Sequence, residues 1–116
     1  MSRVIQMRTF NMNRHIFQNS AFLKALYRAH PFQRKTMIDF ITANQVAALS
    51  QIAYKILRRR ITISNVQRER LRPYKRYVRF IANPQINTDR KKRMLRAFHN
   101  MVPLLIEPFL HLLDEN

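Results

Sequence analysis

Apolar residues recur at intervals of three and four along most of this chain, which is the period of an α-helix that buries one face. The clearest example is the segment 43–57, whose apolar positions include Val46, Leu49, Ile52, Ala53, Ile56 and Leu57. No segment alternates apolar and polar residues over the length that a strand needs. The pattern therefore predicts an all-α fold, a compact bundle of about five to six short helices.

Prolines and polar caps predict where these helices begin and end. A first short helix is expected after Ser20 and stops at Pro31, whose fixed φ and missing N–H suit the first turn of the next helix. This second helix extends to residue 41, and its inward-facing side chains are expected to be Phe32, Met37, Phe40 and Ile41. The choice of inward face rests on hydrophobicity alone.

Two more helix starts have the spacing of a capping box, in which each of two side chains accepts a hydrogen bond from the other residue's amide. Thr42 and Gln45 open the helix at 43–57, and Ser64 and Gln67 open a fourth helix. The apolar stripe of this fourth helix consists of Leu71, Tyr74, Val78 and Ile81. Pro73 falls inside the pattern and predicts a kink.

The C-terminal end of the chain is apolar. Thr88 and Asp89 predict the start of a fifth helix, with Met94, Leu95, Phe98 and Val102 facing the core. After Pro103 a last helix is expected, bent or split at Pro108. Two interpretations of residues 101–113 remain open: a helix that closes the core, or a surface for self-association or for contact with a capsid or a membrane.

The length of 116 residues predicts one domain. We assign residues 1–19 to a basic N-terminal arm and residues 20–116 to a single helical domain with an apolar C-terminal helix. The arm contains Arg3, Arg8 and Arg14 and no acid, a composition shared by arms that contact polyanions and by mitochondrial presequences. No apolar run approaches the ~20 residues of a membrane-spanning helix.

The balance of charge narrows the possible partners. Lys and Arg number 22 against 6 Asp and Glu, for a formal net charge of +16. Residues 58–96 hold 14 of these cations and two acids, whereas residues 97–116 hold no Lys or Arg. A compact chain with this charge repels itself, and an external polyanion relieves the repulsion. Nucleic acid is the first candidate partner, and an anionic membrane surface is the second.

One row of cations is arranged for a polyanion. On the predicted fourth helix, one face opposite the apolar stripe carries Arg68, Arg72, Lys75, Arg76 and Arg79, which we call the basic ladder. Glu69 is the only acid on this helix, so little neutralises the ladder from within. Two clusters flank it in sequence and are expected to extend it into one band: Arg58, Arg59 and Arg60, and Arg90, Lys91, Lys92 and Arg93. Such a row can follow a phosphate backbone.

Catalytic, metal and cofactor chemistry is not indicated. The chain has no Cys and no Gly, which removes thiolate metal sites and glycine-rich phosphate loops. Its four His residues have no ligand spacing, and no Ser, His and acid set suggests a nucleophile. We expect no enzymatic activity and no cofactor. The chain has no zinc-finger spacing and no evident recognition helix, so recognition of a specific base sequence is not indicated.

Parts of the chain resemble a known family. They are FLKALYRAHPFQRKTMIDFITANQVAALSQIAYKILRRRITIS, QRERLRPYKRYVRFIANPQINTDRKKRMLRAF and the apolar end. These are similar to small basic proteins of Polinton and adintovirus-like elements in animals. The matching positions are Leu57, Leu71, Tyr74, Lys75, Arg90 to Arg93 and Leu95. The resemblance implies a role like that of the basic core protein of adenovirus-like particles, which condenses packaged DNA. The chain departs from the pattern at Pro73 and at residues 100–103, where the family has glycines.

The leading hypothesis is a non-enzymatic protein that binds DNA without sequence preference and neutralises or compacts a genome, in a virion or a host nucleus. DNA is favoured over RNA as the nucleic acid. One alternative is a structural protein of an organellar ribosome or another RNA assembly, located in the mitochondrion. Another is an interaction module whose apolar tail docks on a protein or a membrane.

Overall fold

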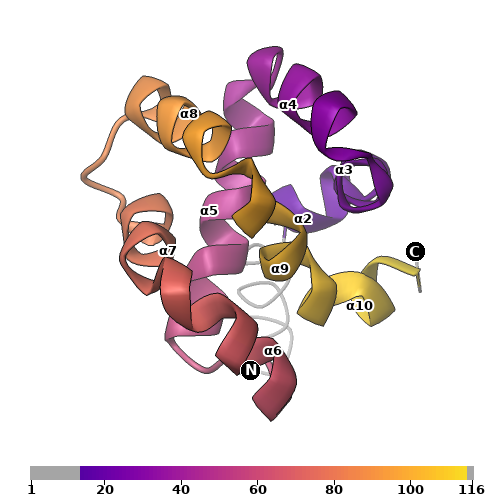
Figure 1. Ribbon diagram of the computed structural model, residues 1–116, viewed down its shortest axis with the longest axis vertical. Coiled ribbons are helices and arrows are strands. Elements are labelled where there is room, and N and C mark those ends of the chain that lie inside the picture. The colour runs from indigo at the N-terminus through magenta and orange to yellow at the C-terminus, as the bar shows by residue number, and fades with distance from the viewer. Residues whose placement is uncertain (1–13, 115–116) are drawn as a thin grey trace, which may run out of the picture.

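The computed structural model describes residues 14–114, and all regular structure in that range is helical, which confirms the all-α prediction (Figure 1). The α-helices are α2 (Arg14–Gln18), α3 (Ser20–Arg28), α4 (Pro31–Asp39), α5 (Ala43–Leu57), α6 (Asn65–Leu71), α7 (Lys75–Ala82), α8 (Thr88–Ala97), α9 (Val102–Ile106) and α10 (Leu110–Asp114). Short 3₁₀ turns join several of them: η1 (Arg72–Tyr74), η2 (His99–Met101) and η3 (Glu107–Phe109).

Helix α5 is the centre of the molecule and contacts α2, α7, α8 and α9. The chain passes down α5 and returns beside it in α6 and α7, while α8 lies across the upper end of this pair (Figure 1). The side chains that α5 buries are Val46, Ala48, Leu49, Ile52 and Ala53. Of the six predicted positions, Val46, Leu49, Ile52 and Ala53 are buried as the period indicates, whereas Ile56 is half-buried and Leu57 is 36% exposed at the end of the helix.

Both predicted capping boxes are present. Thr42 N donates to Gln45 Oε1 at 2.9 Å, and Gln45 N donates to Thr42 Oγ1 at 3.1 Å. Ser64 and Gln67 make the same pair of bonds at 2.9 and 3.1 Å. Each box satisfies amides that a helix start leaves without partners, which places the first turns of α5 and α6.

The C-terminal segment closes the core of the chain. Its fully or nearly fully buried side chains are Met101, Val102, Leu105, Ile106, Phe109 and Leu113. Helix α9 packs on α3, α5 and α6, and α10 packs on α3. Of the two interpretations of residues 101–113, the structure therefore has the first, and the apolar side chains offered to a capsid, a membrane or a second copy are mostly enclosed.

The packed domain starts earlier than we assigned it. Residues 14–18, which we placed in the N-terminal arm, form helix α2 and pack on α5 and α3. Ile16 is 2% exposed and belongs to the core. Cleavage of a presequence near residue 20 would remove this side chain from the core. Residues 1–13, with Arg3 and Arg8, lie outside the described part of the chain.

Helix α4 is turned about its axis relative to the prediction. Phe32 and Phe40, expected in the core, are 82% and 80% exposed, and Arg34 and Ile38 are buried in their place. Ile41 is buried as expected and Met37 is half-buried. Hydrophobicity alone therefore did not predict the buried face of this helix correctly.

Arg34 explains this orientation. Its Nη2 donates to the Ala29 carbonyl at 3.2 Å, and its Nη1 donates to the His99 carbonyl at 3.4 Å and to Asn100 Oδ1 at 3.2 Å. Ala29 caps the C-terminus of α3, and His99 follows the end of α8. Carbonyls at helix ends need donors, and a chain without glycine has fewer ways to close its helices. A buried arginine supplies the donors here.

Candidate nucleic-acid interface

The basic ladder lies on α6, η1 and α7. Pro73 does not simply bend one helix: it sits in a 3₁₀ turn between two α-helices. A 3₁₀ turn rotates the chain by about 20° more per residue than an α-helix does. The residues after the turn are therefore rotated relative to Arg68, and the ladder is not the straight row that the sequence suggested.

Four ladder residues and one flanking arginine surround a groove of about 750 Å³ between the end of α5, the loop at 58–64, and α6 to α7. The cations that line it are Arg59, Arg68, Arg72, Lys75 and Arg79. Its apolar lining comes from Ile56, Leu57, Ile61, Ile63, Leu71 and Val78. We call this hollow the cationic groove. The sequence predicted that Arg59 and the ladder would be neighbours, but it did not predict an apolar floor between them.

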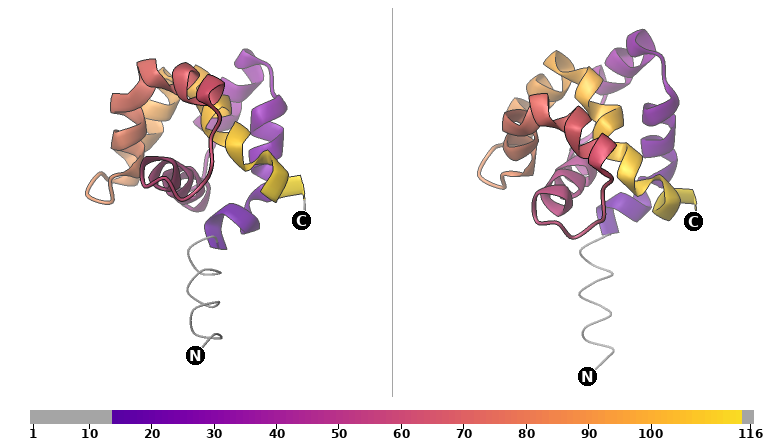
Figure 2. Two further views of the ribbon diagram at one scale, coloured as in Figure 1. Left: turned by 90° about the horizontal axis from the view of Figure 1, so that it is seen from below. Right: turned by 60° about the horizontal axis from the view of Figure 1, so that its bottom comes forward.

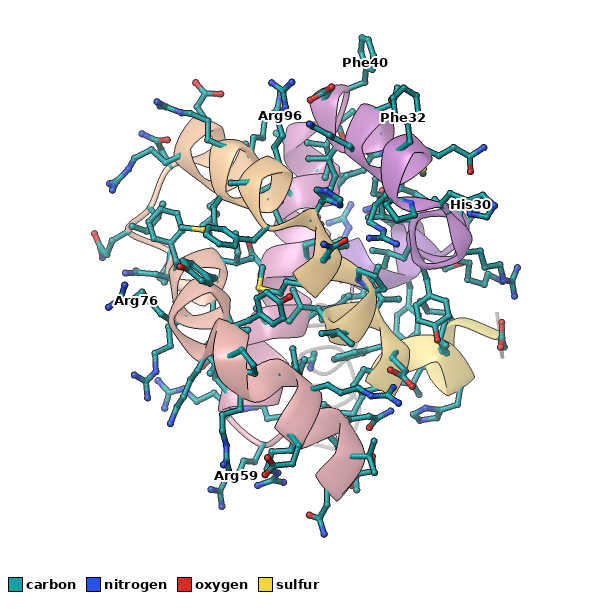
Figure 3. The ribbon with its side chains drawn as sticks, viewed as in Figure 1. His30, Phe32, Phe40, Arg59, Arg76 and Arg96 are labelled. Carbon is teal, nitrogen blue, oxygen red and sulfur yellow. The ribbon has the colours of Figure 1, made fainter. Side chains whose placement is uncertain are left out.

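Arg76 is a ladder residue that does not line the groove. Its side chain projects from α7 to the left in Figure 3, whereas Arg59 projects from the lower end of the molecule. Helix α8, which carries the second flanking cluster, contacts α7 and begins on the same side of the molecule (Figure 1). Arg90 and Arg93 are exposed there, and the Arg90 guanidinium lies 5.4 Å from the centre of the Phe80 ring. Exposed cations therefore extend from Arg59 at the lower end of the molecule, past Arg76 at the left, to the start of α8.

Lys91 does not belong to this surface, contrary to its place in the predicted cluster. It is 7% exposed, and its Nζ donates to Ser50 Oγ at 3.1 Å. Burial lowers the pKa of Lys91. Lys92, its neighbour, is half-buried. Helical geometry explains the correction, because four consecutive residues cover all sides of a helix and one of them must face α5.

Within residues 14–114, Arg72 is the one ladder cation in an ion pair. Its Nη2 lies 2.8 Å from Glu69 Oε1, and both side chains are exposed. An exposed pair three residues apart on a helix contributes little to stability. The other ladder cations have no acid within ion-pair distance in this range. The remaining ion pairs lie elsewhere, as in Arg70 with Glu107 and Arg96 with Asp39.

Cationic side chains crowd one another at the C-terminal end of α5, whose Ile56 and Leu57 line the cationic groove. Burial lowers the pKa of Lys55, and the charge of Arg60 lowers it further. Arg58 lies against the Tyr54 ring, with its guanidinium carbon 5.4 Å from the ring centre. The end of α5 thus concentrates positive charge at some cost to the free protein, and a bound anion would relieve that cost.

Arg59 has the strained backbone of this site. Its φ is 55°, the left-handed region that glycine normally occupies. Arg60 N donates to Lys55 O at 2.9 Å and Arg59 N donates to Ile56 O at 3.2 Å, which are the two bonds of a Schellman motif at the end of α5. The motif calls for glycine at the place that Arg59 fills. No sequence signal marks this position, because the chain has no glycine and the path after α5 is set by packing.

We predict opposite effects of Arg59→Gly on stability and binding. Relief of left-handed strain is worth roughly 1–2 kcal/mol, and the added entropy of glycine in the unfolded chain offsets roughly 0.5–1 kcal/mol of it. The variant should therefore be more stable by up to about 1.5 kcal/mol in urea unfolding, and its affinity for duplex DNA should fall several-fold. Arg59→Lys keeps both charge and strain, so it should show neither change. An unaltered affinity in Arg59→Gly would exclude Arg59 from the interface.

We predict that Lys91→Met and Arg93→Met differ although each removes one charge. Arg93→Met should weaken duplex binding several-fold and reduce the salt slope by about 0.9, the value for one phosphate contact. Lys91→Met should leave both unchanged. Because burial lowers the pKa of Lys91, the folded state binds the Lys91 proton less tightly than the unfolded state does, and wild type should gain stability over Lys91→Met as the pH rises toward the usual Lys value of 10.5. Equal binding losses in the two variants would contradict this placement.

No group of three or more His, Asp or Glu in residues 14–114 is arranged to hold a metal ion. Over the same residues, no helix has the length and hydropathy to span a bilayer. No family model matches the chain, and neither does any curated protein or solved structure.

Proposed function

We propose that this protein binds duplex DNA without sequence preference, through the cationic groove and the exposed cations of α7 and α8, and that it neutralises or compacts a genome. The observation that carries the proposal is the set of cations around the groove, of which, in the described chain, only Arg72 contacts an acid. A surface of this kind raises the free energy of the isolated protein and is stabilised by an external polyanion.

The dimensions of the ladder suit a phosphate backbone. From Arg68 to Arg79 the chain rises by roughly 18 Å, which corresponds to about five phosphates of one DNA strand. Arginine supplies most of the cations, and its planar guanidinium pairs with two phosphate oxygens at once. Contacts to phosphate orient a protein on DNA without reading its sequence. This supports binding that depends on charge rather than on bases.

The resemblance to basic proteins of Polinton and adintovirus-like elements supports a virion or a host nucleus as the place of action. An organellar RNA assembly is the second candidate. A presequence cleaved near residue 20 is disfavoured in that case, because cleavage would remove Ile16, which is buried in the core. The proposal includes no catalytic step.

The salt dependence of binding tests the proposal. With about six phosphates engaged, log Kobs should fall with log salt at a slope near −5, and affinity should drop by roughly 10³ between about 50 and 200 mM salt. Fluorescence anisotropy would measure this with duplexes of mixed, A·T-rich and G·C-rich sequence, whose affinities should agree within about threefold. A slope near zero would overturn the proposal. An RNA duplex that competes more than tenfold better than DNA would favour the RNA assembly instead.

A further inference from the structure

Helix α4 carries an aromatic stripe on its outer surface. Phe32 and Phe40 are 82% and 80% exposed, and Thr36 lies midway between them. Residues at intervals of four lie on one face of a helix, so the three side chains form a row. Figure 3 shows both Phe side chains projecting outward from the top of the molecule. Two large aromatic side chains left in water on one face are typical of an interaction site.

The stripe and the cationic groove face different directions. In Figure 1 and in both views of Figure 2, α7 lies at the left of the molecule and α3 and α4 lie at the right, while α6 lies between them and α8 packs against α4. Arg59 and Arg76 project from the lower end and the left side in Figure 3, away from the two Phe rings. A copy bound to DNA through the groove therefore presents its stripe away from that contact.

We propose that the stripe of Phe32, Thr36 and Phe40 is a contact between two copies of this chain, formed when copies gather on DNA. The inference rests on the proposed function and adds how bound copies connect. The stripe reads aromatic, small, aromatic in both directions. Two α4 helices that pack antiparallel about a two-fold axis at Thr36 therefore place each Phe32 against Phe40 of the other copy, which is the self-complementarity that a two-fold interface requires.

Thr36 suits the position on the axis. It is the small residue of the row, and small side chains at a crossing let helix axes approach to about 8–10 Å. Its Oγ1 donates to the Phe32 carbonyl at 3.2 Å within α4. The hydroxyl therefore keeps a hydrogen-bond partner when water leaves the interface.

The charges beside the stripe also favour a second copy. Lys35 and Asp39 lie along the same edge of the row, one turn apart. In the antiparallel arrangement, Lys35 of one copy comes beside Asp39 of the other, and the pair occurs twice. Asp39 Oδ1 already lies 3.0 Å from Arg96 Nε, which leaves its second carboxylate oxygen for that lysine.

The area explains why DNA is needed. Two exposed Phe rings supply at most roughly 300–500 Å² per copy, less than the ~800 Å² per partner of a stable interface. Free copies also repel one another, because each has a formal charge of +16. Bound DNA neutralises part of this charge and holds copies close together, which raises their effective concentration. Contact is therefore expected on DNA and not in dilute solution.

A single cysteine tests whether the partner is a second copy, because the chain has none of its own. In Thr36→Cys the two thiols meet at the axis, where helices at this spacing allow the Cα distance of about 4.4–6.8 Å that a disulfide needs. Under mild oxidation with a long duplex present, this variant should form covalent dimers, and it should not do so without DNA. Val66→Cys, at a 59% exposed site on α6, is the control and should stay monomeric. Equal cross-linking of both variants, or of neither, overturns the proposal.

Removal of the rings tests what the contact does. Phe32→Ser with Phe40→Ser should leave binding to a duplex of about 12 base pairs unchanged, because roughly 40 Å of DNA holds one copy. On a duplex of about 60 base pairs, the affinity per copy should fall about tenfold as cooperativity is lost. Val66→Ser should change neither value. Weaker binding to the short duplex would mean that the rings stack on bases, and it would overturn the contact between copies.

The same titrations separate this inference from the function on which it rests. If wild type binds neither duplex, the proposed DNA binding fails. If wild type binds both duplexes with equal affinity per copy and Thr36→Cys gives no dimer, DNA binding stands and the contact between copies alone is wrong. Circular dichroism of the double Phe variant should match wild type, because neither ring contributes to the core.

Discussion

Reversal of two ladder charges, in Arg68→Glu with Arg79→Glu, is expected to weaken binding to a mixed-sequence duplex by about 100-fold or more at ~0.1 M salt. Both residues are exposed, both line the cationic groove, and neither has an acid partner within residues 14–114. Each exchange removes a phosphate contact and places a carboxylate against the DNA. The slope of log Kobs against log salt should fall in magnitude by about two, since each contact contributes about 0.9.

The control for this experiment is a variant with the same change in net charge elsewhere. Arg14→Glu with Arg28→Glu also lowers the formal charge by four units, because each exchange removes two. Both residues are exposed, on α2 and α3, and neither lines the cationic groove. If total charge alone governed binding, the two double variants would bind equally. If the groove is the interface, the control should lose much less affinity. Both proteins should unfold at urea concentrations close to that of wild type.

Truncation of Phe109 is expected to give the largest loss of stability. Phe109 is 1% exposed at the junction of η3 and α10, and Phe→Ala in a protein core typically costs about 3–5 kcal/mol. Since small domains are stable by only about 5–15 kcal/mol, the variant should unfold at a much lower urea concentration than wild type. Urea unfolding followed by circular dichroism would measure the difference.

A less buried residue of the same segment provides the comparison. Leu110 is half-buried, so Leu110→Ala should cost about 1 kcal/mol or less. If residues 101–113 were instead a surface for a membrane or a protein, Phe109→Ala would leave the unfolding of the isolated protein unchanged and would weaken binding of that partner. A Phe109→Ala variant with wild-type stability would therefore contradict the enclosed position of this segment.

Local signals in the sequence located most helices correctly. The two capping boxes, the period of α5, and the prolines at the start of α4 and within the fourth predicted helix are all contained in one helix or its first turn, so they could be identified without the tertiary structure. Helix α2 was missed because it has a single turn of sequence with no such signal, and it is held by Ile16 in the core. Its stability comes from packing and not from its own propensity.

The candidate interface was predictable only in part. The excess of cations between residues 58 and 96 and the ladder are properties of sequence and helical period. Which cations reach solvent is not, as Lys91 shows by turning toward Ser50. The strain at Arg59 also depends on the path of the chain after α5. Both facts follow from contacts between residues far apart in the sequence.

The sequence by itself determined that this chain is helical, strongly cationic between residues 58 and 96, and able to close a single core, because period, charge and hydrophobicity are local or additive properties. Tertiary structure alone decided which side of α4 is buried. There, Arg34 is buried and donates hydrogen bonds to three groups at the ends of α3 and α8, whereas Phe32 and Phe40 are exposed. The ends of α3 and α8 come beside Arg34 only once the helices pack, so α4 considered in isolation does not show these acceptors.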